Sequence, residues 1–510
     1  MIKFYALKEQ SMSYKTQLSK LLKTPLTYTS IALLTLTGCG SSDDDSGTGY
    51  FQLYNSSSTA PAIYLTVDQY DDDDYSESTH TGIEYTSVSS RLQYDSDTYD
   101  IELAWKDEDY DLELIYEDQL TIQDDVLKFI VVAENIKEPN VQIYDIPVRD
   151  DDEKDDDDDD DLFNIRFLNI YLEASNLDIY LSESDETFNE AELIAQSSYT
   201  ELTENQKFDQ DDYIFYLTAA GSNEVLFTSS EISFPYASEY IVVIRENKGA
   251  GDSPYVMDRI ATSSITEYVD HDSEAAFRIY NGIVEHELLP NYNSSIDLHV
   301  DGVDDSPEVS ALSFGEFSDS IQTAFSDYNI SVLASEDNSP LIENHLLTLN
   351  ANSDKTVFFY LTEDNVDEDG DGDVDEDGDG YVDEIEITLN SLVVDNSQNE
   401  SIYTHQINVI NLIDHDDFSS VNVYFVKSDE IVDTAENSIT ASYIVPNSIS
   451  LVNNSYSVYA IAKVDSSDLI ISASELVLND ESKDQFLILE ADEASATGYK
   501  ATFTEQMVNH

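Results

Sequence analysis

The chain has 510 residues and is strongly acidic, with 107 Asp and Glu against 22 Lys and Arg and a formal net charge of −85. This charge excludes nucleic acid as a partner, because binding DNA or RNA needs basic groups that displace counterions, and it disfavours anionic lipid headgroups. Hydrophobic residues (41%) and aromatic residues (11%) are too abundant for a disordered polyanion, so the length predicts three or four domains with acidic surfaces.

The N-terminal segment has the features of a targeting sequence rather than of a folded domain. Three lysines at residues 15–23 precede a short apolar stretch at residues 26–36. The stretch ends in Leu-Thr-Gly-Cys at residues 36–39, which resembles the lipobox of bacterial lipoproteins. We therefore expect residues 1–38 to be a lipoprotein signal peptide.

This resemblance implies that Cys39 carries a lipid anchor. Cys39 is the only cysteine, which excludes an intrachain disulfide bond. Several acyl chains on one residue hold a protein stably at a membrane. Gly40 after the cysteine favours export to the bacterial outer membrane. Whether the protein faces the periplasm or the cell surface stays open. Residues 39–49 then form a flexible polar tether, and no other apolar run is long enough to span a bilayer. The start of translation, Met1 or Met12, stays open as well.

Four similar segments follow the tether, and their markers recur at nearly constant spacing. Each segment begins with a strand that ends in Asn, continues with an alternating strand opened by Tyr, and ends with a strongly apolar strand. The Asn-to-Tyr separations are 44, 44, 47 and 45 residues. In chain order the markers are Asn55, Tyr99 and Phe129; Asn169, Tyr213 and Tyr240; Asn281, Tyr328 and Phe358; and Asn411, Tyr456 and Phe486.

This pattern predicts an all-β protein of four tandem antiparallel β-sandwich domains with an immunoglobulin-like fold. Period-2 alternation, strand-sized runs and turn-rich gaps are typical of such sandwiches. We interpret the repeated Tyr as a tyrosine corner whose hydroxyl fixes a loop, and the repeated Asn as a turn residue that bonds to the backbone through its side chain. The predicted domains are residues 50–149, 162–270, 275–400 and 403–505.

The opening of the first repeat resembles a known family. Residues 53–64 read Leu-Tyr-Asn-Ser-Ser-Ser-Thr-Ala-Pro-Ala-Ile-Tyr, and the other three repeats lack the Pro at this point. The sequence is similar to an uncharacterised, domain-of-unknown-function family of tandem bacterial envelope domains. The resemblance implies a β-sandwich fold and a location in the cell envelope, and it implies no activity.

Residues 150–161 form an almost continuous block of Asp between the first and second repeats. The block has no glycine turns and no alternation of ligand and spacer. A run of like charges extends by self-repulsion, so we expect an acidic linker rather than a defined ion site.

The third repeat contains the one tract whose residue types and spacing specify a chemistry. From residue 367 to residue 386 it places carboxylates at alternate positions, has Gly at the turns, and contains no Lys or Arg. Calcium loops use this pattern, and the second half resembles a complete EF-hand loop with Val382 as an inward anchor. The predicted Ca²⁺ ligands of this loop are Asp375, Asp377, Asp379, the backbone carbonyl of Tyr381, Asp383 and the bidentate Glu386.

An overlapping copy begins eight residues earlier and lacks the closing Glu. It is similar to the Asp-rich repeats of thrombospondin type 3, and strand-like flanks argue against a calmodulin-type switch. The Asn markers are 114 and 112 residues apart in the early repeats but 130 apart across the third, so we predict that residues 364–386 contain an insertion of about 17 residues in a late hairpin. The predicted ligands of the first copy are Asp367, Asp369, Asp371 and Asp373.

No catalytic motif stands out in the sequence. The eight His are scattered, Gly249-Ala-Gly251 is a lone G-x-G without a following helix, and 107 acids leave no way to choose a glycosidase pair. We therefore expect a non-enzymatic, calcium-binding, lipid-anchored envelope protein with a structural or adhesive role, facing an extracellular protein or polysaccharide. The alternative is a calcium-dependent carbohydrate- or ligand-binding surface module, and a hydrolase is the least supported class.

Overall fold

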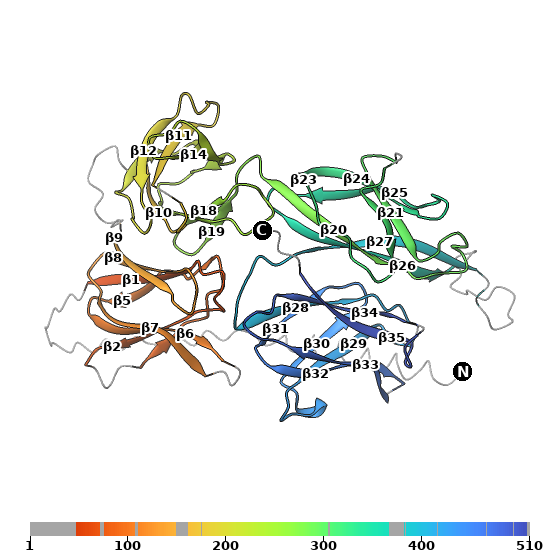
Figure 1. Ribbon diagram of the computed structural model, residues 1–510. Helices are drawn as coiled ribbons and strands as arrows, with labels where there is room; N and C mark the ends of the chain where they lie inside the picture. Colours follow the sequence, from red (N-terminus) through yellow and green to blue (C-terminus); the bar gives the residue numbers. More distant parts are fainter. Residues whose placement is uncertain are drawn as a thin grey trace, which may run out of the picture. The chain divides into compact units, whose positions relative to one another are not determined.

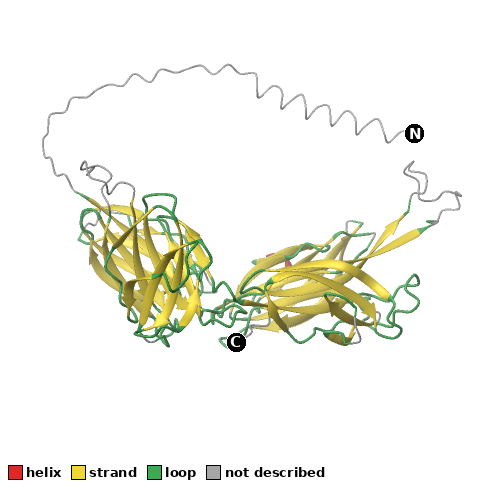
Figure 2. Cartoon of the chain, turned by 90° about the horizontal axis from the view of Figure 1, so that it is seen from above, coloured by secondary structure: helices red, strands yellow, loops and turns green. Residues whose placement is uncertain are grey.

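The computed structural model describes residues 47–71, 76–107, 111–148, 162–174, 176–303, 306–366, 382, 384–415, 417–465, 467–492 and 494–506. All the described residues lie within Ser46–His510, which forms one compact unit. Within these ranges the chain forms strands joined by loops, with one short 3₁₀ helix at Val432–Thr434 (Figures 1 and 2). No helix in these ranges is long and apolar enough to cross a membrane.

The first sandwich consists of two sheets. One has the order β4-β1-β8-β9, with β5 also paired to β1, and the other has the order β3-β2-β6-β7 (Figure 1). β1 begins at Thr48, so the last two residues of the predicted tether belong to this sandwich. Its strands are β1 (Thr48–Asn55), β2 (Tyr64–Gln69), β3 (Ser78–Thr79), β4 (Ser87–Val88), β5 (Leu92–Asp95), β6 (Thr98–Lys106), β7 (Leu112–Thr121), β8 (Val126–Ala133) and β9 (Asn140–Pro147).

The second sandwich repeats this plan with one strand more. Its sheets have the orders β13-β10-β17-β18-β19 and β12-β11-β14-β15, with β16 also paired to β14. Its strands are β10 (Leu162–Asn169), β11 (Leu177–Glu183), β12 (Glu192–Ser197), β13 (Gln206–Asp209), β14 (Asp212–Ala219), β15 (Val225–Thr228), β16 (Ile232–Ser233), β17 (Glu239–Glu246), β18 (Tyr255–Ile260) and β19 (Ile265–Tyr268).

The third sandwich has two four-stranded sheets, β23-β20-β26-β27 and β22-β21-β24-β25. Its late strands β26 and β27 are long and form the hairpin that the acidic tract closes. Its strands are β20 (Glu274–Gly282), β21 (Ser295–Val300), β22 (Val309–Ser313), β23 (Ile321–Ala324), β24 (Ser326–Ala334), β25 (Pro340–Leu349), β26 (Asp354–Asn365) and β27 (Ile385–Asp395).

The fourth sandwich has the same topology, with the sheets β31-β28-β34-β35 and β30-β29-β32-β33. Its strands are β28 (Thr404–Asn411), β29 (Ser420–Val426), β30 (Asn437–Ser442), β31 (Asn447–Val452), β32 (Ser455–Val464), β33 (Ser467–Val477), β34 (Gln485–Ala491) and β35 (Tyr499–Glu505).

The all-β sandwich fold is confirmed, but the sheets are not purely antiparallel as predicted. In every sandwich the first strand pairs in parallel with the late apolar strand, namely β1 with β8, β10 with β17, β20 with β26, and β28 with β34. A parallel pair needs a long crossover, and here the strands of the opposite sheet supply it. Spacing along the sequence indicates which strands exist, whereas the direction of their pairing depends on this return path.

The four marker tyrosines are tyrosine corners, as predicted. Each hydroxyl donates a hydrogen bond to the backbone carbonyl four residues earlier, at 2.6–3.0 Å, and so fixes the turn between two strands. The pairs are Tyr99 with Asp95, Tyr213 with Asp209, Tyr328 with Ala324, and Tyr456 with Val452.

The four marker asparagines are buried turn residues, which is also confirmed. In each repeat the side-chain oxygen accepts the backbone N–H two residues later, at 3.0–3.1 Å. In three repeats the side-chain nitrogen also donates to a carbonyl in or beside the opposite sheet, so one amide ties the two sheets together. These bonds run from Asn55 to Ile83, from Asn281 to Leu312, and from Asn411 to Ala441.

The sandwiches pack in two pairs through the outer faces of the sheets that contain the marker Asn. In the first pair, Phe129 and Val131 of the first sandwich share a cluster with Ile241 and Val243 of the second. In the second pair, the cluster joins residues of the third and fourth sandwiches, including Phe358 and Phe486. Strands buried on both faces read as continuous apolar runs rather than alternating ones, which explains the strongly apolar late strand of each repeat.

Candidate functional site

The acidic tract closes the hairpin of β26 and β27. The two strands pair from Lys355 opposite Asp395 to Asn365 opposite Ile385, and the Val366 N–H then donates to the Glu384 carbonyl at 3.0 Å. The prediction that the tract interrupts a late hairpin between strands is therefore confirmed. Of the predicted Ca²⁺ ligands, those outside the described residues are Asp367, Asp369, Asp371, Asp373, Asp375, Asp377, Asp379, Tyr381 and Asp383.

Glu386 is the one predicted ligand that the structure describes, and it lies in β27 directly opposite Asp364. Both side chains are exposed and lie on the same face of the hairpin. Two like charges directly opposite destabilise a strand pair, so a bound cation at this end would relieve a repulsion that the described residues already contain. Val382, predicted to point inward, is instead 37% exposed.

The middle of this hairpin contacts the fourth sandwich. The Tyr443 hydroxyl donates to the Leu361 carbonyl at 3.1 Å, and the ring of Tyr443 meets that of Tyr360 edge-on. Burial, with the nearby carboxylates of Asp414 and Asp364, raises the pKa of the Tyr443 hydroxyl, which therefore stays protonated and able to donate. The position of the hairpin is thus coupled to the packing of the second pair.

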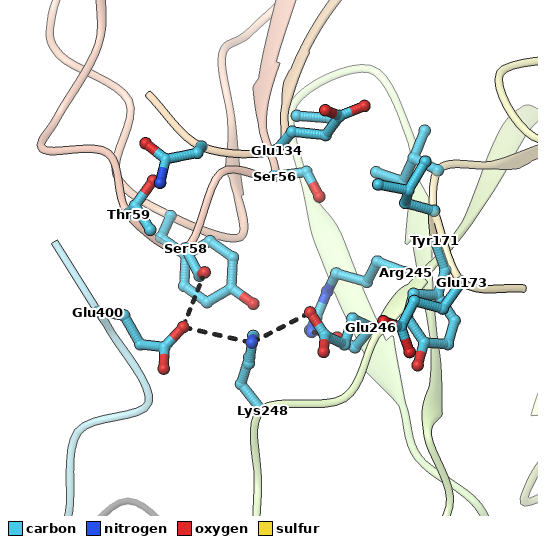
Figure 3. A pocket seen from close by; sticks show the side chains of 15 residues that line it. Ser56, Ser58, Thr59, Glu134, Tyr171, Glu173, Arg245, Glu246, Lys248 and Glu400 are labelled. Atoms are coloured by element: carbon cyan, nitrogen blue, oxygen red, sulfur yellow. Dashed lines mark hydrogen bonds and ion pairs between the residues drawn. The ribbon is translucent and has the colours of Figure 1, made fainter. Parts of the chain in front are cut away.

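A second feature is a pocket of about 400 Å³ at the end of the first pair (Figure 3). We call it the junction pocket, because both sandwiches of the first pair and the segment between the third and fourth sandwiches line it. Its walls hold both charged and hydroxyl side chains, which face a common space (Figure 3). It is lined by residues 56, 58, 59, 85, 133–135, 170–173, 245, 246, 248 and 400.

Lys248 crosses one side of the junction pocket. Its ammonium lies 3.0 Å from a carboxylate oxygen of Glu246 and 3.2 Å from one of Glu400, which also accepts the Ser58 hydroxyl at 3.1 Å (Figure 3). Burial alone would lower the pKa of Lys248, but the two carboxylates outweigh it and raise the pKa. Glu400 thereby joins residues of the first and second sandwiches to the segment that precedes the fourth.

The floor of the junction pocket includes Arg245, which forms a buried ion pair within the second sandwich. Arg245 Nε lies 2.7 Å from Asp258 Oδ2, which also accepts the hydroxyl of Tyr54 at 2.5 Å, and Arg245 pairs with Glu267 as well. Burial raises the pKa of Tyr85 beside this pair to about 12, although the charge of Arg245 partly opposes the shift. A buried, bidentate pair of this kind fixes the geometry of the floor, because loss of either partner leaves a charge uncompensated.

The lone G-x-G at residues 249–251 is a contact between the second and third sandwiches. Asn352 enters the loop, where its side-chain oxygen accepts the N–H of Gly251 at 2.8 Å and the amide of Asn247 at 3.0 Å. A Cβ atom at Gly249 would lie 2.3 Å from the Asn352 amide. The glycines are required here by close approach of another chain segment.

Sequence reasoning did not find the junction pocket, because its walls come from distant parts of the chain. One signal was present: Glu-Asn follows the apolar strand in both early repeats, at Glu134-Asn135 and Glu246-Asn247. A repeated polar pair beyond a core strand indicates two equivalent loops. Their meeting at one end depends on the face-to-face pairing of the sheets.

Comparisons with known proteins add no family. No protein-family model matches the sequence, and no curated protein sequence shows significant similarity to it. The resemblance of the first repeat to tandem envelope domains therefore stays a prediction.

Three solved structures show remote similarity. The Bacillus anthracis TIE protein is 6% identical, with 88% of this chain and 75% of that chain covered and a TM-score of 0.15. An adhesin candidate from Bacteroides ovatus is 9% identical, with 44% and 96% covered and a TM-score of 0.14. A leucine-rich repeat protein from Bacteroides thetaiotaomicron is 14% identical, with 38% and 25% covered and a TM-score of 0.11. Similarity at this level carries no functional argument.

Proposed function

We propose that this chain is a non-enzymatic, lipid-anchored envelope protein in which Ca²⁺ stiffens the pair formed by the third and fourth sandwiches. The role would be structural or adhesive, with an extracellular protein or polysaccharide as partner. The observation that carries the proposal is the hairpin of β26 and β27. The acidic tract closes it, and its strands contribute Phe358, Leu392 and Val394 to the packing on the fourth sandwich.

Electrostatic repulsion within the acidic tract supports calcium binding. The tract repels itself without a cation, and the facing carboxylates of Asp364 and Glu386 add to that repulsion at its base. Oxygen ligands at alternate positions suit Ca²⁺, with a dissociation constant on the order of 10⁻⁴–10⁻³ M as in extracellular modules. Binding to the folded chain stabilises it by about 1.4 kcal/mol at a free Ca²⁺ concentration ten times the dissociation constant.

Calorimetry of the full chain with Cys39→Ser tests this proposal. Ca²⁺ should raise the melting temperature of the second pair, and the triple variant Asp375→Asn, Asp377→Asn, Asp379→Asn should abolish the effect. A matched control, Asp157→Asn, Asp158→Asn, Asp159→Asn, removes the same charge from the acidic linker and should leave the response intact. Equal responses of both triple variants would contradict a defined site in the tract.

The lipid anchor has an independent test. Palmitate labelling of cells that express the chain should be lost on Cys39→Ser, because no other cysteine is present. Labelling that persists in this variant would refute the anchor and leave the calcium proposal untouched.

A second candidate is a calcium-dependent carbohydrate- or ligand-binding surface. It is supported by exposed aromatic rings, which suit sugar faces, such as Tyr70 at 47% and Tyr236 at 70% exposure. Glycan-array binding that disappears with a chelator would favour this candidate. Calcium-dependent melting without any glycan signal would favour the structural role.

A further inference from the structure

The junction pocket is built from corresponding segments of two repeats. Residues 56–59 follow the marker Asn of the first sandwich, and residues 170–173 follow that of the second. Glu134 directly follows the late apolar strand of its repeat, and Glu246 is the last residue of the corresponding strand. Two sandwiches packed face to face thus bring equivalent loops to one end, and loops at a domain interface are a preferred place for ligand binding.

The lining of the pocket holds more carboxylates than cations, with four Glu against one Arg and one Lys. Its two cations are already engaged, Arg245 by Asp258 and Lys248 by Glu246 and Glu400. In the described part of the chain, neither Glu134 nor Glu173 forms an ion pair, and both are exposed, while one oxygen of Glu134 accepts the Asn140 amide and the Tyr199 hydroxyl. A chain of net charge −85 also concentrates cations at its surface. These conditions favour a positively charged ligand that donates hydrogen bonds.

The ammonium group of Lys248 shows how this pocket can bind a positively charged amine. This ammonium is held by carboxylates from two different segments, at 3.0 and 3.2 Å, with the Ser58 hydroxyl bonded to one of them (Figure 3). Glu134, Glu173 and the Ser56 hydroxyl line the same pocket, and Lys248 is the one lysine among the lining residues. An ammonium group from a ligand would pair with these carboxylates as Lys248 pairs with Glu246 and Glu400.

The size of the pocket favours an organic ion over a metal ion. Ca²⁺ gathers six to eight oxygens at about 2.3–2.6 Å, whereas these carboxylates are spread around about 400 Å³, the volume range of small-molecule sites. The hydroxyl groups of Ser56 and Thr59 and the amide of Asn135 line the same space and pair well with hydroxyl groups.

We infer that the junction pocket binds a small organic ammonium ion that also carries hydroxyl groups, the chemistry of an amino sugar. The site is separate from the acidic tract, so this inference does not rest on calcium binding. Recognition is by charge-assisted hydrogen bonds to the rim carboxylates, which makes it sensitive to salt.

Titration of the Cys39→Ser full chain with D-glucosamine near pH 6, followed by calorimetry at low ionic strength, tests the inference. Glucosamine should bind saturably, and glucose, which lacks the ammonium, should bind at least about tenfold more weakly, since a hydrogen bond to a charged group contributes about 1.5–3 kcal/mol. Glu173→Gln should weaken glucosamine binding by about the same factor.

The matched control is Glu192→Gln, an exposed glutamate of β12 in the same sandwich that does not line the pocket. It removes the same charge and should leave glucosamine binding unchanged. Equal binding of glucose and glucosamine, equal loss in Glu173→Gln and Glu192→Gln, or no saturable binding of glucosamine would each overturn the inference. The triple Asp→Asn variant of the tract should bind glucosamine normally, which separates this result from the calcium result.

Discussion

The first and second pairs of sandwiches use the same interface and stabilise it differently. In each pair, a Tyr directly precedes the marker Asn of the earlier sandwich and lies near an acidic residue of the later one. Tyr54 donates a hydrogen bond to Asp258, and Tyr280 lies near Glu490. In the first pair, the buried Arg245 forms an ion pair with Asp258. In the second pair, Lys500, whose side chain is one third exposed, lies 3.1 Å from Glu490. In both pairs, the buried acid at the interface forms an ion pair with a cation of its own sandwich.

The loops at the end of each pair differ more than the interfaces. After the late strand, the first pair has short loops that leave the junction pocket between them. At the equivalent place the third sandwich extends its hairpin and carries the acidic tract. A duplicated frame thus has a pocket at one place and an acidic segment at the other.

The largest effect on stability should come from removing the ion pair between Arg245 and Asp258. Arg245→Met leaves Asp258 buried and uncompensated and should lower the free energy of unfolding of the first pair by about 3–5 kcal/mol. Lys500→Met should cost the second pair much less, because the ion pair of Lys500 is partly hydrated. Denaturant unfolding of both variants measures the difference, with the exposed Lys463→Met as control. Equal losses in the two pairs would remove the distinction drawn here.

The second pair should respond to mild acid through Asp354. Burial raises the pKa of its carboxyl to about 6, and the Asn396 amide and the charge of Arg278 oppose this shift only in part. Since the unfolded value is about 3.9, the folded chain binds more protons between these values, so stability rises as the pH falls from about 6 to about 4 and is lost as the pH rises again. The expected change is about 2 kcal/mol.

Asp354→Asn tests this directly, because it removes the titration and keeps an oxygen acceptor for the Asn396 amide, which now bonds to Asp354 at 3.0 Å. The pH dependence of unfolding of the second pair should flatten in this variant. Asp319→Asn, at an exposed position of the same sandwich, is the control and should keep the slope. An unchanged slope in Asp354→Asn would assign the titration elsewhere.

Contacts between the pairs should be broken by Gly249→Ala. The new methyl group would collide with Asn352 of the third sandwich and should cost about 1–2 kcal/mol of the stability of this contact. Asn352→Ala removes the colliding side chain, so the double variant should lose less than the sum of the two single variants. Full additivity would show that the G-x-G does not serve this contact.

Much of the fold was predictable because its signals are local. Each marker Tyr bonds to the carbonyl four residues earlier and each marker Asn oxygen to the N–H two residues later, and the hairpin insertion followed from an excess in repeat spacing. The pairing of sandwiches was not predicted, although the unbroken apolar runs of β8 and β17 indicated burial on both faces.

The junction pocket was beyond reach for another physical reason. Lys248 and Glu400 belong to different sandwiches and segments, and nothing in their local sequence distinguishes them from other charged loop residues. Their meeting depends on how the folded sandwiches dock. The charge excess still offered a hint, since the sequence holds 107 acidic residues as candidate partners for 22 basic ones.

The smallest expected effect concerns two lysines that both connect the first pair to the second. Lys248 bridges Glu246 and Glu400 with its side chain 15% exposed, whereas Lys137 reaches Asp480 with both side chains about half exposed. Lys248→Met should lower stability by about 1 kcal/mol at low salt, and Lys137→Met should have no measurable effect, because a hydrated pair contributes little. Both variants change the net charge equally, so their difference isolates burial. Salt at 0.5 M should reduce the stability loss of Lys248→Met, because it screens the ion pair. A loss that salt leaves unchanged would show that packing of the side-chain stem, rather than the ion pair, stabilises the junction.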